Sequence, residues 1–389
     1  MNIRPLCDGV DFLGAADWNR RLFDSLIPLP DGTSYNAYLV RGTDQTALLD
    51  TVDPAQWPVL RDQLAGLARL DYVVAHHAEQ DHSGSLPFVL EKFPGAKVVT
   101  NPKCRDMLID LLQLPESAFR TVADGETLDL GGKTLEFLYT PWVHWPETMC
   151  TWLKEDRILF SCDFFGSHLA TTDVFAADPA ATLEAAKRYY AEIMMPFRGP
   201  IRRNLDKVLA KDVRWIAPSH GPVHGQPESI LQAYQDWVSD AVKNEVVLPY
   251  VSMHGSTQKM AEALVTALAA RGVKVHLFDL TVTDVGKLAI ALVDAATLVL
   301  GTPTVHVGPH PAAHYVAHLA NAIRPKVRFA SVIGSYGWST KVVEQVAALI
   351  PNLKVELLQP VICRGDPRPA TFAELDALAA AIAARHAAL

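Results

Sequence analysis

The two halves of the chain differ in how their apolar residues are spaced. From Glu245 onward, apolar runs such as EVVLPYVS (245–252) and ATLVLGTPT (296–304) alternate with amphipathic stretches such as STQKMAEALVTALAARG (256–272). This alternation is typical of a parallel sheet with helices on both faces. Further strands are predicted at 274–280 and 327–335, and further helices at 309–324 and 339–350. The second half is therefore predicted to be an open parallel α/β sheet.

The first half has shorter strands that follow one another in pairs. Residues 34–50 have the pattern of two strands joined by the turn RGTD. A helix at 55–69, a strand at 71–77 and a helix starting near Ser85 follow. Short strands are predicted at 97–100, 127–130, 134–139, 149–153, 157–161 and 214–219. Paired strands interleaved with helices predict two mixed sheets covered by helices.

A helix at 227–243 is predicted to close the first half, with a length of roughly 25 Å at about 1.5 Å per residue. The change of pattern sets a domain boundary near 243–246. We therefore expect one domain over residues 1–244 and a second over residues 245–389. The length of 389 residues and the hydrophobic share of 49% agree with more than one core.

Charge and targeting features narrow the class of protein. The formal net charge is -8 and basic runs are missing from the sequence, which argues against nucleic acid or an anionic membrane as a partner. The sequence has no apolar run of the ~18 residues that a membrane helix needs. The start, MNIRPLCDGVDFLGAADW, lacks the pattern of an export signal. Five scattered cysteines without C-x-x-C spacing predict reduced thiols in the cytoplasm and argue against a zinc finger or a rubredoxin-like site.

The stretch HHAEQDHSG (76–84) directly follows the apolar run LDYVVA. If strand geometry continues past Ala75, His77, Glu79 and Asp81 point to one side, and His82 lies on the turn into the next helix. His76 then faces away and is expected to pack or cap. A solvated loop that happens to be rich in His and Asp is the alternative for this stretch taken alone.

Three further residues of the kinds that bind metals follow apolar strands later in the chain. They are His144 in PWVHWPETM, Asp163 in LFSCDFFGSH and His220 in IAPSHGPVHG. Strand ends at one sheet edge could bring them together with the first cluster. Four histidines and three carboxylates suffice for two metal ions that share a carboxylate. A nitrogen and oxygen set without thiolate suits iron, although it also admits zinc or manganese.

Three loops of the second half are predicted to hold a ligand. VSMHGSTQKMAEA (251–263) places small hydroxyl residues and a glycine between a strand and a helix, where backbone N–H groups bind phosphate. It has neither a Walker motif nor G-x-G-x-x-G, and a capped helix without a ligand is the alternative. The loops at 301–311 and 334–341 should open on the same carboxyl edge. Tyr336 and Trp338 offer flat surfaces suited to an isoalloxazine ring.

The motif order resembles a known family. H-x-E-x-D-H, then H-W-P, a strand-end Asp and S-H-G, is similar to the metal pattern of metallo-β-lactamase-like folds. Glu79 resembles the flavodiiron branch, because dizinc hydrolases usually carry His at that position. The resemblance covers essentially the whole chain. It implies an α/β protein with an N-terminal metallo-β-lactamase-like αββα sandwich, followed by a flavodoxin-like doubly wound parallel sheet.

This resemblance also implies roles for individual residues. One iron would be held by His77, Glu79 and His144, the other by Asp81, His82 and His220, with Asp163 bridging. His168 is expected to line the pocket or to hydrogen-bond beside the metals, and His224 stands where many relatives carry an aromatic residue. FMN phosphate would contact Ser252, His254, Gly255, Ser256 and Thr257. Its ring and ribityl chain would contact Pro303, Thr304, His306, Ser335, Tyr336, Gly337 and Trp338.

The implied activity follows from counting electrons. Two ferrous ions and one reduced FMN carry four, which matches dioxygen reduction to two waters, and two electrons suffice to couple two nitric oxide molecules into nitrous oxide. The resemblance implies a cytoplasmic flavodiiron oxygen and/or nitric oxide reductase. It also implies a head-to-tail homodimer or a dimer of such dimers, with a separate electron donor such as rubredoxin or a reduced deazaflavin. The alternatives are a metallo-β-lactamase-type hydrolase with a flavodoxin appendage, and an electron carrier with an inactive metal domain.

Overall fold

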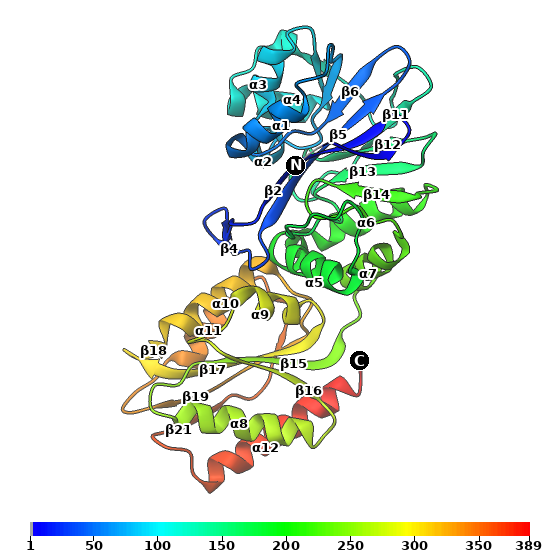
Figure 1. Cartoon of the computed structure of the whole chain (residues 1–389). Coiled ribbons are helices and arrows are strands. Elements are labelled where there is room, and N and C mark those ends of the chain that lie inside the picture. Colours follow the sequence, from blue (N-terminus) through cyan, green and yellow to red (C-terminus); the bar gives the residue numbers. More distant parts are fainter. Residues whose placement is uncertain (1–2) are drawn as a thin grey trace. The chain divides into compact units, whose positions relative to one another are not determined.

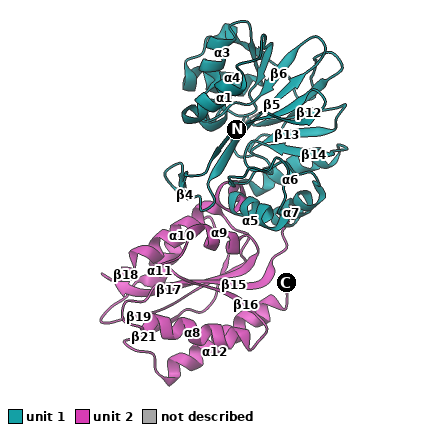
Figure 2. Cartoon of the chain, in the orientation of Figure 1, with its two compact units in different colours: residues 1–189, 197–238 teal, residues 190–196, 239–389 magenta. Residues whose placement is uncertain are grey.

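The computed structural model describes residues 3–389, which form two compact units (Figures 1 and 2). Unit 1 comprises the chain up to Tyr189 together with Phe197–Val238, and unit 2 comprises Tyr190–Pro196 and Ser239–Leu389. The domain limits 1–244 and 245–389 stay a prediction. Within residues 3–389, no helix combines the length and the apolar character needed to cross a membrane.

Unit 1 contains two mixed sheets, as predicted. The first has the strand order β1 (Arg4–Cys7), β2 (Val10–Asp17), β5 (Thr33–Arg41), β6 (Thr46–Leu49), β7 (Tyr72–Val74), β8 (Lys97–Thr100) and β9 (Phe119–Thr121). The second has the order β10 (Thr127–Asp129), β11 (Thr134–Tyr139), β12 (Met149–Leu153), β13 (Ile158–Cys162) and β14 (Trp215–Pro218). A small hairpin is formed by β3 (Leu22–Phe23) and β4 (Ile27–Pro28).

The core of unit 1 contains inward-facing apolar residues of both sheets. Tyr38 of β5 and Phe160 of β13 meet there with ring centroids 5.0 Å apart. The two sheets face each other through these apolar residues, and helices lie beside both sheets (Figure 1). They are α1 (Trp57–Gln63), α2 (Gln80–Ser83), α3 (Leu86–Lys92), α4 (Pro102–Leu112), α5 (Pro179–Tyr189), α6 (Arg198–Leu209) and α7 (Glu228–Val238).

Strand direction decides where the ends of β13 and β14 emerge. These two strands are parallel, and Cys162 pairs with Pro218. The residues that follow, Asp163 and Ser219–His220, therefore leave the sheet at the same edge. In the other sheet, β7 runs parallel to β6 and β8, and the loop that contains His76 and His77 follows its carboxyl end.

Three predicted elements of the first half are clearly shorter in the structure, and one of them is the helix expected at 55–69, which spans Trp57–Gln63 as α1. The strand expected at 71–77 ends at Val74, and the backbone N–H of His76 donates to Asp50 Oδ1 at 3.0 Å. The expected alternation of His77, Glu79 and Asp81 along a strand is therefore wrong, because Asp81 already belongs to α2.

The helix expected at 227–243 also differs. It ends at Val238, and β15 begins at Lys243. The Ser239 hydroxyl accepts from the Ala241 N–H at 3.3 Å, a local side-chain bond of the kind that competes with helix continuation. The expected length of roughly 25 Å for this segment is therefore wrong.

Unit 2 is the predicted doubly wound parallel sheet. Its strand order is β16 (Lys274–Asp279), β15 (Lys243–Tyr250), β17 (Ala295–Val305), β19 (Phe329–Tyr336) and β20 (Glu356–Leu357), while β21 (Val361–Arg364) also pairs with β19 and β18 (Gly308–Pro309) with β17. Helices α8 (Ser256–Ala269) and α12 (Pro369–His386) cover one face, and α9 (Val285–Leu292), α10 (Pro311–Ile323) and α11 (Val342–Leu349) cover the other (Figure 1). The order reverses between β15 and β17, where such sheets bind ligands at their carboxyl edge.

Candidate metal centre and cofactor pocket

All seven predicted ligand residues come from loops or short turns at the ends of strands in unit 1. His77 and Glu79 follow β7, and Asp81 and His82 lie in the short helix α2. His144 lies between β11 and β12, Asp163 follows β13, and His220 follows β14. A rigid strand therefore precedes most of these side chains, which is how a fold holds ligands in fixed positions.

The structure gathers the residues into two groups, in which Glu79 and His144 are half-buried and the other residues are buried. In the first, the Nε2 atoms of His77 and His144 each lie 3.1 Å from Glu79 Oε2. The ligand atoms of these three residues and of Asp163 all lie within 4.8 Å of one another.

The second group contains Asp81, His82 and His220. Asp81 Oδ2 lies 3.1 Å from His220 Nε2 and 3.4 Å from His82 Nε2. All three side chains are buried, so water screens their charges only weakly.

Asp163 lies between the two groups and turns one oxygen to each. Its Oδ2 atom is 3.5 Å from the Nε2 atoms of His77 and His144. Its Oδ1 atom is 2.9 Å from His82 Nε2 and 3.5 Å from His220 Nε2. A carboxylate in this position can coordinate one ion through each oxygen, which is the geometry of a bridging ligand.

The pairing of polar atoms tests whether cations fit here. Both carboxylate oxygens of Asp81 and of Asp163, and the Nε2 atom of His82, are buried without a hydrogen-bond partner within residues 3–389. A buried polar atom without a hydrogen-bond partner costs ~1–3 kcal/mol. Divalent ions in the two groups would satisfy these atoms, so the residues fit a pair of metal ions.

The electrostatics of the histidines agree with that fit. Burial lowers the pKa of His82, but the Asp81 and Asp163 carboxylates outweigh burial and raise it to about 10. For His144, burial is likewise outweighed by the Asp163 and Glu79 carboxylates, and its pKa is also about 10. Such strong attraction for protons indicates a site whose negative charge favours any cation.

Cys162 is a neighbour of the second group that sequence reasoning missed. Its Sγ atom lies within 4.8 Å of ligand atoms of His82 and Asp163. Burial, reinforced by the carboxylates of Asp50 and Asp163, raises the pKa of this thiol well above its usual range. The thiolate is the form that binds metals, so Cys162 would have to lose this proton to act as a ligand.

Hydrogen bonds on the far side of two imidazoles orient them. His220 Nδ1 donates to the Ser34 carbonyl at 2.6 Å, which leaves the lone pair of Nε2 toward Asp81 and Asp163. His77 Nδ1 lies 2.7 Å from Glu147 Oε1 in the same way. Neither Ser34 nor Glu147 was predicted. Glu147 is visible in HWPETM, three residues after His144, but its role depends on a tertiary contact.

The remaining histidines of the motifs lie outside both groups. His76 is buried with Nδ1 2.8 Å from Asp50 Oδ2 and Nε2 2.7 Å from Thr151 Oγ1, in agreement with the expected packing role. His168 lies beside the second group, with its ring centroid 4.7 Å from that of His220 and its Nδ1 atom 2.8 Å from Thr33 Oγ1.

His168 and His224 are both buried. Burial and the neighbouring His220 lower the pKa of His168 well below its usual range, so His168 is neutral. His224 Nε2 is bonded to the Phe165 carbonyl at 3.0 Å.

A pocket of about 380 Å³ opens at the carboxyl edge of the unit 2 sheet. Every predicted cofactor residue lines it except Gly255, which has φ +88° and is the N-cap residue directly before α8. Gly365 lines it as well and was not predicted.

Polar and aromatic groups of this pocket fit a phosphorylated ring compound. Thr257 Oγ1 is buried without a partner within residues 3–389, beside the N-terminus of α8, where N–H groups favour an anion. Trp338 is 77% exposed and free to cover a flat ligand. An FMN phosphate near Thr257 and its ring near Trp338 therefore fit this pocket.

Comparisons with known proteins agree with the fold and the two sites. Residues 33–221 match the family model of the ODP family beta lactamase, and residues 248–377 match that of flavodoxin. The chain is 35% identical to the coenzyme F420H(2) oxidase of Methanothermobacter marburgensis, with 86% of each chain covered. It is 33% identical to the nitric oxide reductase of Moorella thermoacetica, with 91% of this chain and 90% of that one covered.

A solved structure extends the likeness over the full length. The rubredoxin oxygen:oxidoreductase of Desulfovibrio gigas superposes with a TM-score of 0.95 at 28% identity, covering 99% of both chains. The chain therefore belongs to the flavodiiron family of type A flavoproteins. The predicted family and fold class are confirmed.

Proposed function

We propose that this chain is a flavodiiron oxidoreductase that passes electrons from FMN to an iron pair and reduces dioxygen to water, nitric oxide to nitrous oxide, or both. The observation that carries this proposal is Asp163, whose two oxygens face two separate groups of metal-ligand residues. Relatives named nitric oxide reductase and rubredoxin-oxygen oxidoreductase support both gases as substrates. The hydrolase alternative is disfavoured by Glu79 and by the cofactor pocket.

We assign the iron pair to residues 1–244 and FMN to residues 245–389. One iron would be held by His77, Glu79 and His144, the other by Asp81, His82 and His220, and Asp163 would bridge them. When bound, the irons and a reduced FMN supply the four electrons that dioxygen reduction requires, or the two that coupling of two nitric oxide molecules requires.

The chain's own residues prepare this centre in three ways. Glu79, Asp81 and Asp163 bring negative charge that balances the cations. The Ser34 carbonyl and Glu147 hold the imidazoles of His220 and His77 with Nε2 toward the centre. Burial of five of the seven ligand side chains limits the access of bulk water and strengthens the charge interactions there.

The cofactor pocket divides into a phosphate end and a ring end. Hydroxyl and N–H groups at the start of α8 would bind the phosphate, through Ser252, His254, Gly255, Ser256 and Thr257. Loops after β17 and β19 would hold the ring and the ribityl chain, through Pro303, Thr304, His306, Ser335, Tyr336, Gly337 and Trp338.

Partners and compartment extend the proposal. We propose a separate electron donor, either a rubredoxin or a reduced deazaflavin, because relatives are named rubredoxin-oxygen oxidoreductase and coenzyme F420H(2) oxidase. We propose a head-to-tail homodimer, or a dimer of such dimers, in which each flavin faces the irons of the other chain. The unpaired cysteines Cys7, Cys104, Cys150, Cys162 and Cys363 support a cytoplasmic location.

Metal analysis and single-turnover kinetics test the function. Purified protein expressed with iron should contain two irons and one FMN per chain. After anaerobic reduction it should be reoxidised by dioxygen, by nitric oxide, or by both, and the ratio of the two rates gives its preference. Iron- and FMN-replete protein that reacts with neither gas, or active protein that holds zinc alone, would overturn the proposal.

A further inference from the structure

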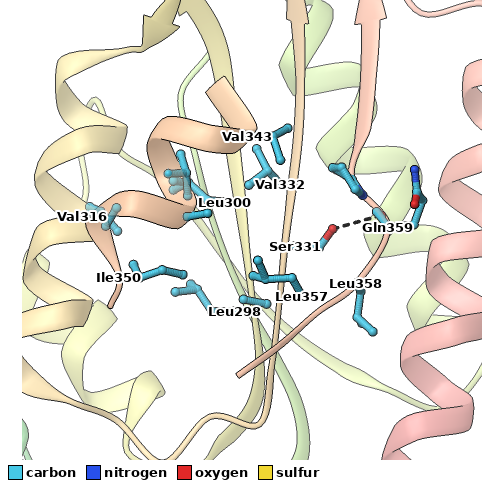
Figure 3. Close-up of a pocket in the computed structure, with 15 residues that line it drawn as sticks. Leu298, Leu300, Val316, Ser331, Val332, Val343, Ile350, Leu357, Leu358 and Gln359 are labelled. Atoms are coloured by element: carbon cyan, nitrogen blue, oxygen red, sulfur yellow. Dashed lines mark hydrogen bonds between the residues drawn. The ribbon is translucent and has the colours of Figure 1, made fainter. Parts of the chain in front are cut away.

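A second cavity of unit 2 lies away from the cofactor pocket. It has a volume of about 140 Å³ and lies between the sheet and helices α10 and α11 (Figure 3). No residue lines both this cavity and the cofactor pocket among those that the structure describes. Its walls are aliphatic, as Leu298, Leu300, Val316, Val332, Val346 and Ile350 illustrate.

The lining offers little to a polar ligand. Among the lining residues that the structure describes, Ser331 alone has a hydroxyl group. This hydroxyl donates to the backbone carbonyl of Gln359 at 3.3 Å (Figure 3). No buried side-chain nitrogen or oxygen of the lining lacks a partner within residues 3–389. A charged or polar molecule would lose its hydrogen bonds to water here without gaining others. An apolar molecule has no such hydrogen bonds to lose.

The cavity lies next to a gap in the strand pairing at the edge of the sheet. On β19, Phe329–Ala330 pairs with β20 and Ile333–Tyr336 pairs with β21. The ladder is interrupted between them, opposite residues 358–360, and Pro360 has no N–H to donate. The cavity reaches this interruption, because Leu358, Gln359 and Pro360 are part of its lining.

Small residues leave the space inside. Ala317 of α10, Ala330 of β19 and Ala347 of α11 line the cavity at positions where a larger aliphatic side chain would occupy it. Enclosed spaces of about this size, lined by aliphatic side chains, take up molecules such as benzene or xenon in other proteins. This cavity reaches the surface beside Leu357, which lines it and is 57% exposed.

We propose that this cavity is a binding site for small, neutral, apolar molecules, and that it takes up the diatomic gas on which the enzyme acts. The identity of the gas rests on the proposed function. Dioxygen and nitric oxide are uncharged, form weak hydrogen bonds and are smaller than benzene. They therefore fit inside the cavity and match the apolar character of its lining. The cavity would hold substrate gas within the flavin-binding unit.

Methyl NMR of the oxidised, FMN- and iron-loaded full-length protein tests binding with xenon as the probe. Xenon should cause saturable shifts of the Leu298, Ala317 and Val346 methyls, and much smaller shifts at Leu264, which packs on the other side of the sheet with α8. Ala347→Leu should abolish the shifts, because its side chain fills the cavity. Ala348→Leu is the matched control, since Ala348 is the next residue of α11 and is exposed. Ala317→Val serves if Ala347→Leu does not fold.

Wild-type protein without saturable xenon shifts, or equal shifts in Ala347→Leu and Ala348→Leu, would overturn the site. Dissolved dioxygen then tests the gas, because it is paramagnetic and the oxidised enzyme does not consume it. It should enhance relaxation of the cavity methyls several-fold more than that of Leu264, and uniform enhancement would overturn the gas assignment. Neither measurement needs turnover, so an inactive protein with a gas-filled cavity would count against the proposed function alone.

Discussion

His77 stands between two carboxylates, with Glu147 behind it and Glu79 in front. Its Nδ1 atom is 2.7 Å from Glu147 Oε1, and its Nε2 atom is 3.1 Å from Glu79 Oε2. Glu147 also accepts the Ala78 N–H at 3.0 Å, so its position is fixed from two directions. A carboxylate that accepts the Nδ1 proton leaves the Nε2 lone pair on the metal side and makes it a stronger donor.

Replacing Glu147 by Gln should weaken iron binding roughly 10-fold, because it removes the negative charge behind His77 and keeps the size of the side chain. Competition with a chelator of known affinity measures the change. Glu116→Gln is the control, since the Glu116 side chain is 79% exposed and lies far from any ligand in the sequence. Equal iron affinity in both variants would contradict the role of Glu147.

Iron binding to the metal-free protein should release protons. The pKa values of His82 and His144 are about 10 in the metal-free structure, so both imidazoles carry a proton at pH 7.5 that iron must displace. Iron affinity should therefore rise with pH up to about pH 10. Calorimetry at pH 7.5 in buffers of different ionisation enthalpy gives the number of protons, and a result of zero would contradict the prediction.

The same pKa values predict how the metal-free protein responds to pH. A histidine whose pKa is raised in the folded state stabilises that state fully below its unfolded pKa of about 6.5, and this stabilisation is lost as pH rises toward about 10. Metal-free protein should thus lose thermal stability between about pH 6.5 and 10. Iron-loaded protein should lose much less, and identical pH profiles would contradict the argument.

Asp163→Ala should remove the shared ligand and abolish reductase activity. Iron content should fall below two per chain, because both groups lose an oxygen that faces them. The FMN absorbance should stay, because the pocket residues belong to unit 2. Asp62→Ala is a suitable control, since its side chain is 71% exposed. Retention of two irons and activity by Asp163→Ala would rule out the bridge.

Thr257→Arg should give colourless protein that still binds iron. Thr257 is buried at the start of α8 with its hydroxyl unpartnered, so an Arg side chain would occupy the space of the phosphate. Thr266→Arg, at an exposed position of the same helix, should stay yellow. Absorbance near 450 nm and iron content are the measurements. A yellow Thr257→Arg protein would show that the phosphate binds elsewhere.

Elements with plain apolar patterns were predicted best. The limits expected for β8, β11 and β12 coincide with the structure, because each is a short run bounded by turn residues. The strand β2 was not predicted, because Gly14 and two alanines interrupt its apolar pattern. A Cβ atom at Gly14 would lie 2.1 Å from the Tyr35 carbonyl, so close strand packing explains the glycine only once the fold is known.

The site shows the same division between local and tertiary information. The seven proposed ligands were visible because each follows an apolar run, and strand ends meet at a sheet edge. The residues that orient them were not visible, because Glu147 is 70 residues from His77 and Ser34 is 186 residues from His220. The strand predicted through His77 was too long, because the Asp50 side chain captures the His76 N–H.

The proposed head-to-tail dimer predicts that two inactive chains restore each other. His220→Ala lacks a ligand of the second iron but keeps its flavin pocket, and Thr257→Arg keeps its irons but lacks FMN. An isologous two-fold contact would pair each flavin with the irons of the other chain. Differently tagged chains, co-expressed and purified as heterodimers, should therefore contain one working site of two and about half of the wild-type activity per dimer.

A second heterodimer distinguishes transfer between chains from transfer within one chain. It combines the wild-type chain with a chain that carries both His220→Ala and Thr257→Arg. If electrons cross between chains, the wild-type flavin faces damaged irons and the wild-type irons face an empty flavin pocket, so this heterodimer should be nearly inactive. Transfer within a chain gives the opposite pair of results, because the wild-type chain then works alone and the two single variants stay dead together. Activity in this second heterodimer with none in the first would overturn the head-to-tail arrangement.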